Sequence, residues 1–192
     1  MEINHSEVSR SELDVFAELD DVQVVFDVGA RMQMDSSTVP SIVDYIKIHP
    51  NATYHLFEPN KVYADALREV TKDMKNVLIN QYGLGRVRGI IPYSETKQAF
   101  SGGEIGPLGG TPLPVKTLDW YVKKHNIERI DFLKIDTEGF DYNVLLGGKN
   151  SLKLCRYIQY EEWVNKEQFY KLLGKDFHMK EMGFRNVICV RK

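Results

Sequence analysis

Carboxylates stand at the ends of three short apolar segments, where they could bind or activate a hydroxyl group. Asp27 lies in VVFDVGA, Glu58 follows TYHLF, and Asp136 and Glu138 follow IDFLKI. If these segments are strands of a parallel sheet, their carboxyl ends meet at the edge where open α/β sheets bind ligands. A carboxylate there can accept hydrogen bonds from an amino group or from both hydroxyls of a ribose. Two acids together can orient or deprotonate a substrate hydroxyl, or hold a divalent cation.

Each of these positions also has an ordinary structural explanation, and the alternatives stay open at this point. Gly29 lets the backbone approach a ligand closely, but it also suits a plain strand-to-helix turn. Glu58 could simply face solvent before a helix, and Asp136 or Thr137 could cap the next one. A dinucleotide site is disfavoured because the chain has no GxGxxG motif.

Other kinds of site have little support. The five histidines show no HxxxH or HxxH spacing, and Cys155 and Cys189 show no CxxC or CxxH spacing, so we expect no zinc site. No serine lies in a GxSxG setting, which disfavours hydrolase chemistry. Lys134 is expected to extend its charged end to solvent or to pair with an acid rather than to catalyse. Glu161, at the end of a later strand, is a reserve candidate for a base.

The elements that position these residues alternate between strand and helix. Apolar, β-branched runs predict strands at 22–28, 53–57, 76–80, 130–135, 157–160 and 184–190. Helical spacing of apolar residues predicts helices at 11–19, 36–48, 61–72, 117–125, 140–146 and 166–173. In the helix at 61–72, Val62, Ala66 and Leu67 should face inward. The alternation implies an α/β fold with a mostly parallel sheet, helices on both faces and an antiparallel C-terminal strand.

A glycine-rich span at 83–110 interrupts the alternation and holds eight of the fourteen glycines. We expect residues 97–114 to form a long flexible loop that covers a substrate. The flank at 89–93 could add a short edge strand. Such a loop would govern which acceptor molecule enters the site.

Length and composition narrow the class of protein. The 192 residues are 43% hydrophobic and 27% charged, which suits a single domain at 1–192 with 1–20 as a helical lead-in. A formal net charge of -2 gives no bulk attraction to nucleic acid or anionic lipid. No apolar run is long enough for a transmembrane helix, and the polar start lacks a secretory pattern. We therefore expect a cytoplasmic protein with no nucleic-acid partner; the oligomeric state stays open.

Five segments carry a more specific signal: VFDVGA at 25–30, FEPN at 57–60, YGLG at 82–85, VKTLDWYV at 115–122 and IDFLKIDTEGFDYNVLLGG at 130–148. In type, order and separation they resemble the FkbM-like family of S-adenosylmethionine-dependent methyltransferases, over roughly residues 22–161. The resemblance implies a Rossmann-like class I methyltransferase fold. It also implies transfer of a methyl group from the sulfonium to an oxygen, with a sugar, glycan or small natural product as the acceptor.

The resemblance also implies roles for single residues. The cofactor-binding set would be Asp27, Gly29, Ala30, Arg31, Glu58, Pro59, Asn60, Gly83, Leu84 and Asp136. Asp27 and Gly29 would line the methionine end and Glu58 would hold the ribose, while Gly83-Leu84 would lie near the adenine. Asp136 would face the reacting end, and Asp136 and Glu138 are the candidate catalytic acids. No metal ligand set is implied.

The first motif departs from the family pattern, which continues with Asn, an apolar residue and a second glycine. Here Arg31, Met32 and Gln33 take those places. Gln33 would put a side chain where backbone should approach the ligand, and Arg31 adds a cation near a sulfonium. Alternatively, Arg31 could bind the carboxylate of the cofactor. The second functional hypothesis is therefore a catalytically impaired or non-catalytic protein that retains the fold and binds an adenosyl or nucleotide ligand.

Overall fold

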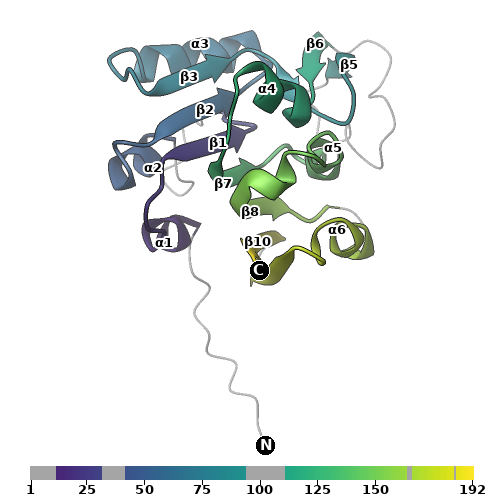
Figure 1. Ribbon diagram of the computed structural model, residues 1–192. Helices are drawn as coiled ribbons and strands as arrows, with labels where there is room; N and C mark the ends of the chain where they lie inside the picture. The colour runs from purple at the N-terminus through teal and green to yellow at the C-terminus, as the bar shows by residue number, and fades with distance from the viewer. Residues whose placement is uncertain (1–11, 32–41, 94–110, 164–165, 184) are drawn as a thin grey trace, which may run out of the picture.

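The computed structural model describes residues 12–31, 42–93, 111–163, 166–183 and 185–192 (Figure 1). The strands are β1 (Val24–Val28), β2 (Thr53–Phe57), β3 (Val77–Asn80), β4 (Gly83–Leu84), β5 (Gly89–Tyr93), β6 (Thr111–Lys116), β7 (Ile130–Ile135), β8 (Cys155–Glu161), β9 (Phe177–Gly183) and β10 (Asn186–Arg191). The helices are α1 (Glu12–Ala17), α2 (Ile42–Ile48), α3 (Lys61–Val70), α4 (Leu118–Lys124), α5 (Asp141–Leu146) and α6 (Lys166–Leu173), with a short 3-10 helix, η1 (Leu152–Leu154).

Seven strands form one sheet in the order β3-β2-β1-β7-β8-β10-β9. In this order, β3, β2, β1, β7 and β8 pair in parallel. Strand β10 pairs antiparallel with both β8 and β9. The predicted parallel sheet with an antiparallel C-terminal strand is confirmed. Strand β9 was not predicted, because exposed charged residues such as Lys180 and Glu181 break up its apolar pattern at the edge of the sheet.

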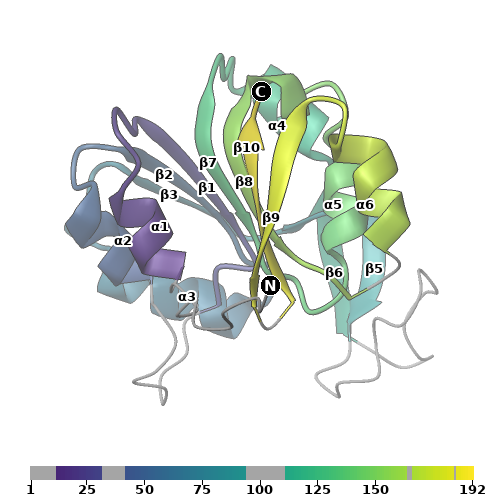
Figure 2. The ribbon, with the colours of Figure 1, turned by 90° about the horizontal axis from the view of Figure 1, so that it is seen from below.

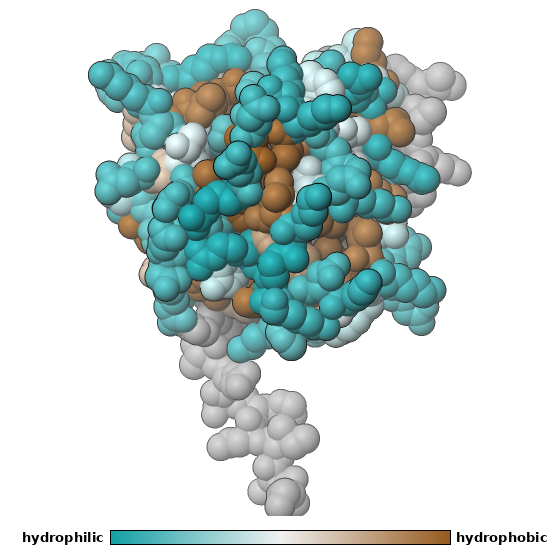
Figure 3. Space-filling model, in the orientation of Figure 1, coloured by the Kyte–Doolittle hydropathy of each residue, from teal (hydrophilic) through white to brown (hydrophobic). Residues whose placement is uncertain are grey.

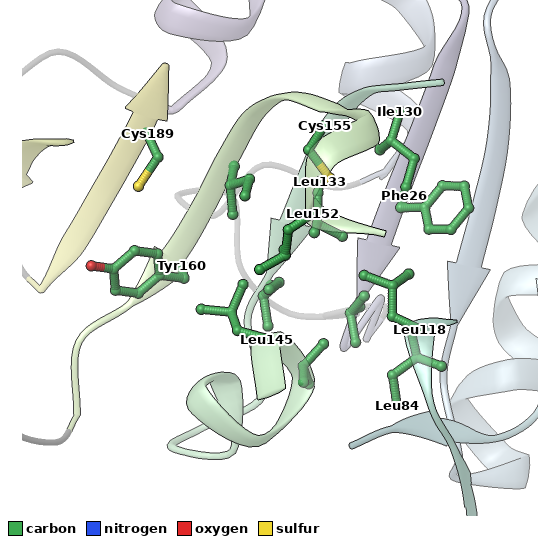
Figure 4. Packing of buried hydrophobic residues seen from close by; sticks show 14 of the residues in the cluster. Phe26, Leu84, Leu118, Ile130, Leu133, Leu145, Leu152, Cys155, Tyr160 and Cys189 are labelled. Carbon is green, nitrogen blue, oxygen red and sulfur yellow. The ribbon is translucent and has the colours of Figure 1, made fainter. Parts of the chain in front are cut away.

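The sheet is covered on both faces, as the sequence predicted (Figure 2). Helices α1–α3 lie on one face and α4–α6 on the other, so the core divides into two clusters. The first takes Phe16, Tyr45 and Leu67 from α1–α3, and the second takes Tyr121, Leu145 and Phe169 from α4–α6. Figure 4 shows part of the second cluster, where Leu133 of β7 lies close to Leu152 and Leu145. Burial on both faces explains why β1 and β7 are mostly apolar, with Asp27, Asp131 and Lys134 as their charged residues.

A second, three-stranded sheet has the order β4-β6-β5. The edge strand expected at 89–93 is confirmed as β5, which pairs antiparallel with β6. The loop expected at 97–114 is wrong at its end, because Thr111–Pro114 belongs to β6. The preceding residues, 97–110, lie outside the described part of the chain, and so does the first part of the helix expected at 36–48. Prolines at 112 and 114 made a strand look like a loop.

Helix α3 agrees with the prediction in part, because Leu67 faces inward and Ala66 is partly buried, but Val62 does not face inward. Ala64 and Leu67 are fully buried, whereas Val62 is 71% exposed. The buried positions therefore follow a 64, 67, 71 spacing, with Thr71 just past the helix. Val62 was misassigned because it lies in the first turn, before the helix reaches the sheet.

The amino-terminal edge of the sheet is held by Asp131, whose side chain is fully buried. It accepts hydrogen bonds from the backbone N–H groups of Gln23 and Val24, both at 2.9 Å, and from Arg129 Nη2 at 2.6 Å. Arg156 Nη1 lies 3.3 Å from the same carboxylate. Burial by itself would raise the pKa of Asp131, but these hydrogen bonds bring it below its ordinary value. Asp131 thus joins the starts of β1 and β7 far from the opposite edge.

Polar and charged residues cover most of the face seen in Figure 3, with hydrophobic atoms showing between them. Among the residues described, no helix has the length and hydrophobicity needed to cross a membrane.

Candidate functional site

The carboxyl ends of β1, β2 and β7 bring three of the predicted acids to one edge of the sheet. Asp27 is the penultimate residue of β1, Glu58 directly follows β2, and Asp136 directly follows β7. The chain runs from β1 outward to β2 and β3 and later returns to β7 on the other side of β1, so strand order reverses between β1 and β7. Ligands of open α/β sheets bind at such a reversal.

Lys134 connects two of these acids. Its Nζ lies 3.6 Å from Asp27 Oδ1 and 3.1 Å from Asp136 Oδ2. The side chain of Asp27 is 8% exposed and that of Asp136 is 37% exposed. Lys134 therefore pairs with acids, as the sequence predicted, and Asp136 is the member of the group that solvent or a ligand can reach.

Gly29 is required by the contact between two loops. Its φ is +87°, and a Cβ at this position would lie 1.9 Å from the carbonyl oxygen of Asp136. The backbone N–H of Asp136 in turn donates to Val28 at 2.9 Å. The N–H groups of Gly29 and Ala30 donate to the carbonyl of Phe57 at 3.0 and 3.2 Å. Together these backbone contacts hold the loop after β1 against β2 and β7.

Glu58 is a buried carboxylate, with 5% of its surface exposed. Its Oε1 accepts a hydrogen bond from the backbone N–H of Asn60 at 2.7 Å. Burial raises the pKa of Glu58 to about 7, and the nearby Asp27 also raises it, while the Asn60 hydrogen bond and Arg31 act in the opposite direction. Asp27 and Glu58 are thus close enough for the charge of one to affect the other.

The residues after Glu58 begin helix α3. Asn60 caps this helix, since its Oδ1 accepts from the N–H of Val62 at 2.9 Å. Pro59 lies beside the end of β4, because a Cβ at Gly83 would be 3.6 Å from Pro59 Cγ. Gly83 and the loop after β2 are therefore neighbours, as their predicted roles require. Leu84 differs: its side chain is buried in the core, so only its backbone could face a ligand.

Arg31 lies on the side of Glu58 rather than in the middle of the edge. Its Nη2 donates to the hydroxyl of Tyr63 at 2.9 Å, and its guanidinium lies 4.5 Å from the centre of that ring. The sequence left open whether Arg31 would oppose a cationic ligand or bind its carboxylate. The observed stacking directs its charge toward Glu58 and α3. Gln33 lies outside the described residues.

The loop after β7 has an unusual backbone. Glu138 has φ +55° and Gly139 has φ +100°, and the Glu138 side chain is exposed. The expectation that Asp136 or Thr137 caps α5 is wrong: Phe140 takes the cap position and makes no side-chain hydrogen bond there. A left-handed non-glycine residue costs roughly 1–2 kcal/mol. This turn carries the candidate acid Glu138 at the rim of the edge.

Asp141, which sequence reasoning missed, joins this loop to β8. It is 1% exposed and accepts hydrogen bonds from Thr137 Oγ1 at 2.6 Å and from the backbone N–H of Glu161 at 2.9 Å. Burial raises the pKa of Asp141 to about 7, against the effect of these hydrogen bonds. An acid in the first turn of a helix is ordinary in sequence, so only its spacing after the preceding acids could have drawn attention to it.

Glu161, the reserve candidate, does belong to this group. Its pKa is raised by burial and then by the charges of Asp136 and Glu138, and a hydrogen bond from Trp163 Nε1 at 2.6 Å lowers it. Lys134 also lowers it. The carboxyl edge thus gathers acids from four strands, named from here on the acid cluster: Asp27, Glu58, Asp136, Glu138, Asp141 and Glu161.

An excess of carboxylates around one lysine suits a ligand that carries positive charge and hydroxyl groups. Two of the carboxyl groups have pKa values near neutrality, which suits proton transfer. Within the ranges that the structure describes, no group of three or more His, Cys, Asp or Glu residues is placed to hold a metal ion.

Comparison with known proteins agrees with this geometry. Among solved structures, the methyltransferase FkbM from Methylobacillus flagellatus KT is similar with a TM-score of 0.61 and 13% identity, over 88% of this chain and 44% of that one. Fibrillarin from Aeropyrum pernix, in complex with bound S-adenosyl-L-methionine, is similar with a TM-score of 0.50 and 12% identity, over 89% and 66%. At these identities the likeness shows the fold, which is Rossmann-like. Because the match covers 44% of the FkbM structure, the chain spans less than half the length of that protein. No curated protein sequence matches it.

A family model provides the more specific assignment. The model described as the methyltransferase FkbM domain matches residues 27–185, from the first acid of the edge to the β9–β10 turn. Since this match covers most of the chain, the protein belongs to the FkbM methyltransferase domain family.

Proposed function

We propose that the protein is an S-adenosylmethionine-dependent O-methyltransferase that acts on a hydroxyl of a sugar, glycan or small natural product. The observation that carries this proposal is the pair of buried carboxylates Asp27 and Glu58, at the carboxyl ends of the neighbouring strands β1 and β2, next to the reversal of strand order between β1 and β7. Membership of a methyltransferase family supports the reaction type. The acceptor and the choice of oxygen are part of the proposal.

The residues at this edge fit the cofactor in hydrogen bonding and in charge. Glu58 offers a buried acceptor to a ribose diol, as an acid after the second strand does in related folds. Asp27, Asp136 and Glu161 outweigh Lys134 and favour a cationic sulfonium. S-adenosylmethionine, when bound, supplies an activated methyl group.

The protein's contribution to the reaction is placement and proton removal. As the acceptor oxygen bonds to the methyl carbon and the carbon–sulfur bond breaks, the hydroxyl proton passes to a carboxylate. Asp136 is the partly exposed acid nearest the reversal and is our candidate for this role. Glu138 stands at the rim, and Glu161 is held near Asp136 by the hydrogen bond from its backbone N–H to Asp141.

Calorimetric titration with S-adenosylmethionine tests the assignment. Asp27→Asn and Glu58→Ala should each weaken binding by roughly 10- to 100-fold, since each removes a hydrogen bond to a charged group worth about 1.5–3 kcal/mol. Glu69→Ala, on the exposed side of α3, is the matched control and should bind like the wild type. Undiminished affinity in both site variants would refute the assignment.

Binding without any turnover on a panel of hydroxylated acceptors would instead support the second hypothesis, a non-catalytic adenosyl-binding protein. A thermal-shift comparison of S-adenosylmethionine, S-adenosylhomocysteine, NAD and ATP separates that case from a nucleotide-binding one, because only a bound ligand raises the melting temperature.

A further inference from the structure

A groove lies between α6 and the β9–β10 hairpin, which are neighbours in both ribbon views (Figures 1 and 2). Its main cavity has a volume of about 280 Å³ and is lined by Glu162, Lys166, Tyr170, Met179, Lys180, Glu181 and Val187. A second cavity of about 230 Å³ shares Glu162, Glu181 and Val187 and adds Gly183, Arg185 and Asn186. The main cavity lies near the lower end of the roughly 300–1,000 Å³ range of small-molecule sites, so it has room for one ring-sized group.

The groove opens beside the acid cluster. Asn186, which lines the second cavity, pairs with Glu161 across β10 and β8. The N–H of Glu162 donates to the carbonyl of Arg185 at 2.8 Å, which ties the end of β8 to the hairpin. Trp163 donates to the carboxylate of Glu161 at 2.6 Å. No residue of the acid cluster lines either cavity, but the second cavity reaches the end of β8, next to Glu161.

One exposed aromatic side chain, Tyr170, lines the groove, and a second, Trp163, lies beside it, stacked on the lining residue Arg185. Trp163 is 46% exposed and Tyr170 is 49% exposed, although large aromatic residues are usually more buried than that. Each lies near a cation, since Arg185 is 4.1 Å from the Trp163 ring and Lys166 is 5.9 Å from the Tyr170 ring. Aromatic faces next to charged hydrogen-bonding groups suit a ligand with both apolar and polar faces.

The charges of the lining are close to balance. Glu162 and Glu181 provide two carboxylates, and Lys166, Lys180 and Arg185 provide three cations. A site for a phosphate would be strongly cationic, and a site for a quaternary ammonium would be an aromatic cage without lysines. A lining with donors and acceptors in similar number suits an uncharged molecule with several hydroxyl groups.

A buried polar group lies beneath the groove. Tyr160 is fully buried and stacks on Phe169 of α6 at 4.2 Å, and among the described residues its hydroxyl has no hydrogen-bond partner. Figure 4 shows this hydroxyl pointing away from Leu145, on the side of Tyr160 where Cys189 lies. The charges that bear on the hydroxyl come from Cys189, Glu162, Tyr170 and Glu181, and the last three line the main cavity. Buried hydroxyl groups without a hydrogen-bond partner are rare, so the Tyr160 hydroxyl is an unusual feature of the protein beneath this groove.

We propose that this groove is the binding subsite for the acceptor, and that its ligand is an uncharged saccharide ring stacked on Tyr170. The inference rests on the proposed function, because it takes the groove to hold the molecule whose hydroxyl reaches the acid cluster. Glu162 binds ring hydroxyls at the near end, while Lys166 is held by its ion pair with Glu181 on the opposite wall.

Saturation-transfer NMR with the whole protein tests the subsite without requiring turnover. The probes are the methyl glycosides of glucose, mannose, galactose, rhamnose and fucose, with choline as a cationic probe. Inorganic phosphate has no carbon-bound proton, so it is added as a competitor, and its binding is followed through loss of the glycoside signal. The wild type should transfer saturation to ring protons of at least one glycoside. Tyr170→Ala should weaken that glycoside about tenfold, the size expected for loss of one aromatic contact. Glu162→Gln should weaken it as well.

Gln168→Ala is the matched control, since Gln168 is exposed on α6 and does not line either cavity. Circular dichroism of each variant checks that it folds. The proposal is overturned if no glycoside binds, if Tyr170→Ala leaves glycoside binding intact, or if choline or phosphate binds in preference. A parallel titration with S-adenosylmethionine keeps the two proposals apart. Cofactor binding without glycoside binding overturns the subsite alone, and the reverse overturns the cofactor assignment alone.

Discussion

Replacing Glu58 with Gln should stabilise the protein at high pH and weaken its cofactor binding at the same time. Glu58 is buried, and its pKa is raised by that burial from 4.5 to about 7. The folded protein therefore holds a proton over a pH range in which the unfolded chain has released it. The resulting stability is present in full below about pH 4.5 and is lost as the pH rises to about 7.

The size of the effect follows from that interval. At roughly 1.4 kcal/mol per pKa unit, ionised Glu58 makes the folded state about 3 kcal/mol less stable at pH 8 than it would be with a neutral group. Glutamine keeps the acceptor for the Asn60 N–H but adds an amide N–H2 that lacks a ready partner, which costs about 1 kcal/mol. The expected net gain is about 2 kcal/mol at pH 8 and close to zero at pH 5.

Thermal unfolding of wild type and variant at both pH values measures this difference. For a chain of this size, about 2 kcal/mol corresponds to a rise of roughly 4–8 °C in melting temperature at pH 8. Glu69→Gln, at a carboxylate whose side chain is 73% exposed on the helix α3 that follows Glu58, is the control and should change stability by less than about 0.5 kcal/mol at either pH. Calorimetry at pH 8 should show weaker S-adenosylmethionine binding for Glu58→Gln only.

A melting-temperature difference between Glu58→Gln and wild type that does not change between pH 5 and pH 8 would show that Glu58 is not a costly buried charge. A variant that is more stable at pH 8 but binds the cofactor at full strength would separate the two halves of the reasoning. In that case the burial would be correct and the ribose assignment would be wrong.

Other substitutions test the packing at the carboxyl edge of the sheet, at its amino-terminal edge and under helix α3. Gly29→Ala should cost at least about 3 kcal/mol in urea unfolding, because its Cβ would meet the carbonyl of Asp136 at 1.9 Å and φ is positive; a stable variant would show that the two loops can separate. Asp131→Ala should cost roughly 3–5 kcal/mol at pH 7, since it leaves two arginines and two backbone N–H groups without their shared partner, and the loss should shrink as the pH falls through the lowered pKa of Asp131. Leu67→Ala should cost about 2–5 kcal/mol and Val62→Thr less than about 0.5 kcal/mol, and equal effects in chemical denaturation would contradict the observed face of α3.

The central strands could be predicted from sequence because burial on both faces leaves little choice of residue. The bounds predicted for β2 and β7 agree with the structure. Strand β6 could not be predicted, because Pro112 and Pro114 read as a loop. They are tolerated since β4 pairs only with Val115 and Lys116, which leaves the proline stretch with a single neighbouring strand.

The candidate site, too, could be predicted from the sequence only in part. The rule that strand ends meet at one edge was enough to place Asp27, Glu58 and Asp136, since a parallel sheet fixes the direction of every strand. Asp141 could not be found that way, because its importance lies in a contact with Glu161, twenty residues later. The roles of all these residues in binding and catalysis stay predictions.

Strand β10 comes after β9 in the chain but lies between β8 and β9 in the sheet. A nascent chain therefore cannot complete this side of the sheet until Arg191 has left the ribosome. Glu161 ends β8 and Arg191 ends β10, so about 30 residues separate them, or roughly 2–6 s of translation. During that interval the edge of β8 that later pairs with β10 is unpaired. A second nascent chain nearby could pair with this edge instead. Slower translation of this stretch should lower the yield of correctly folded protein, and co-expressed chaperones should restore it.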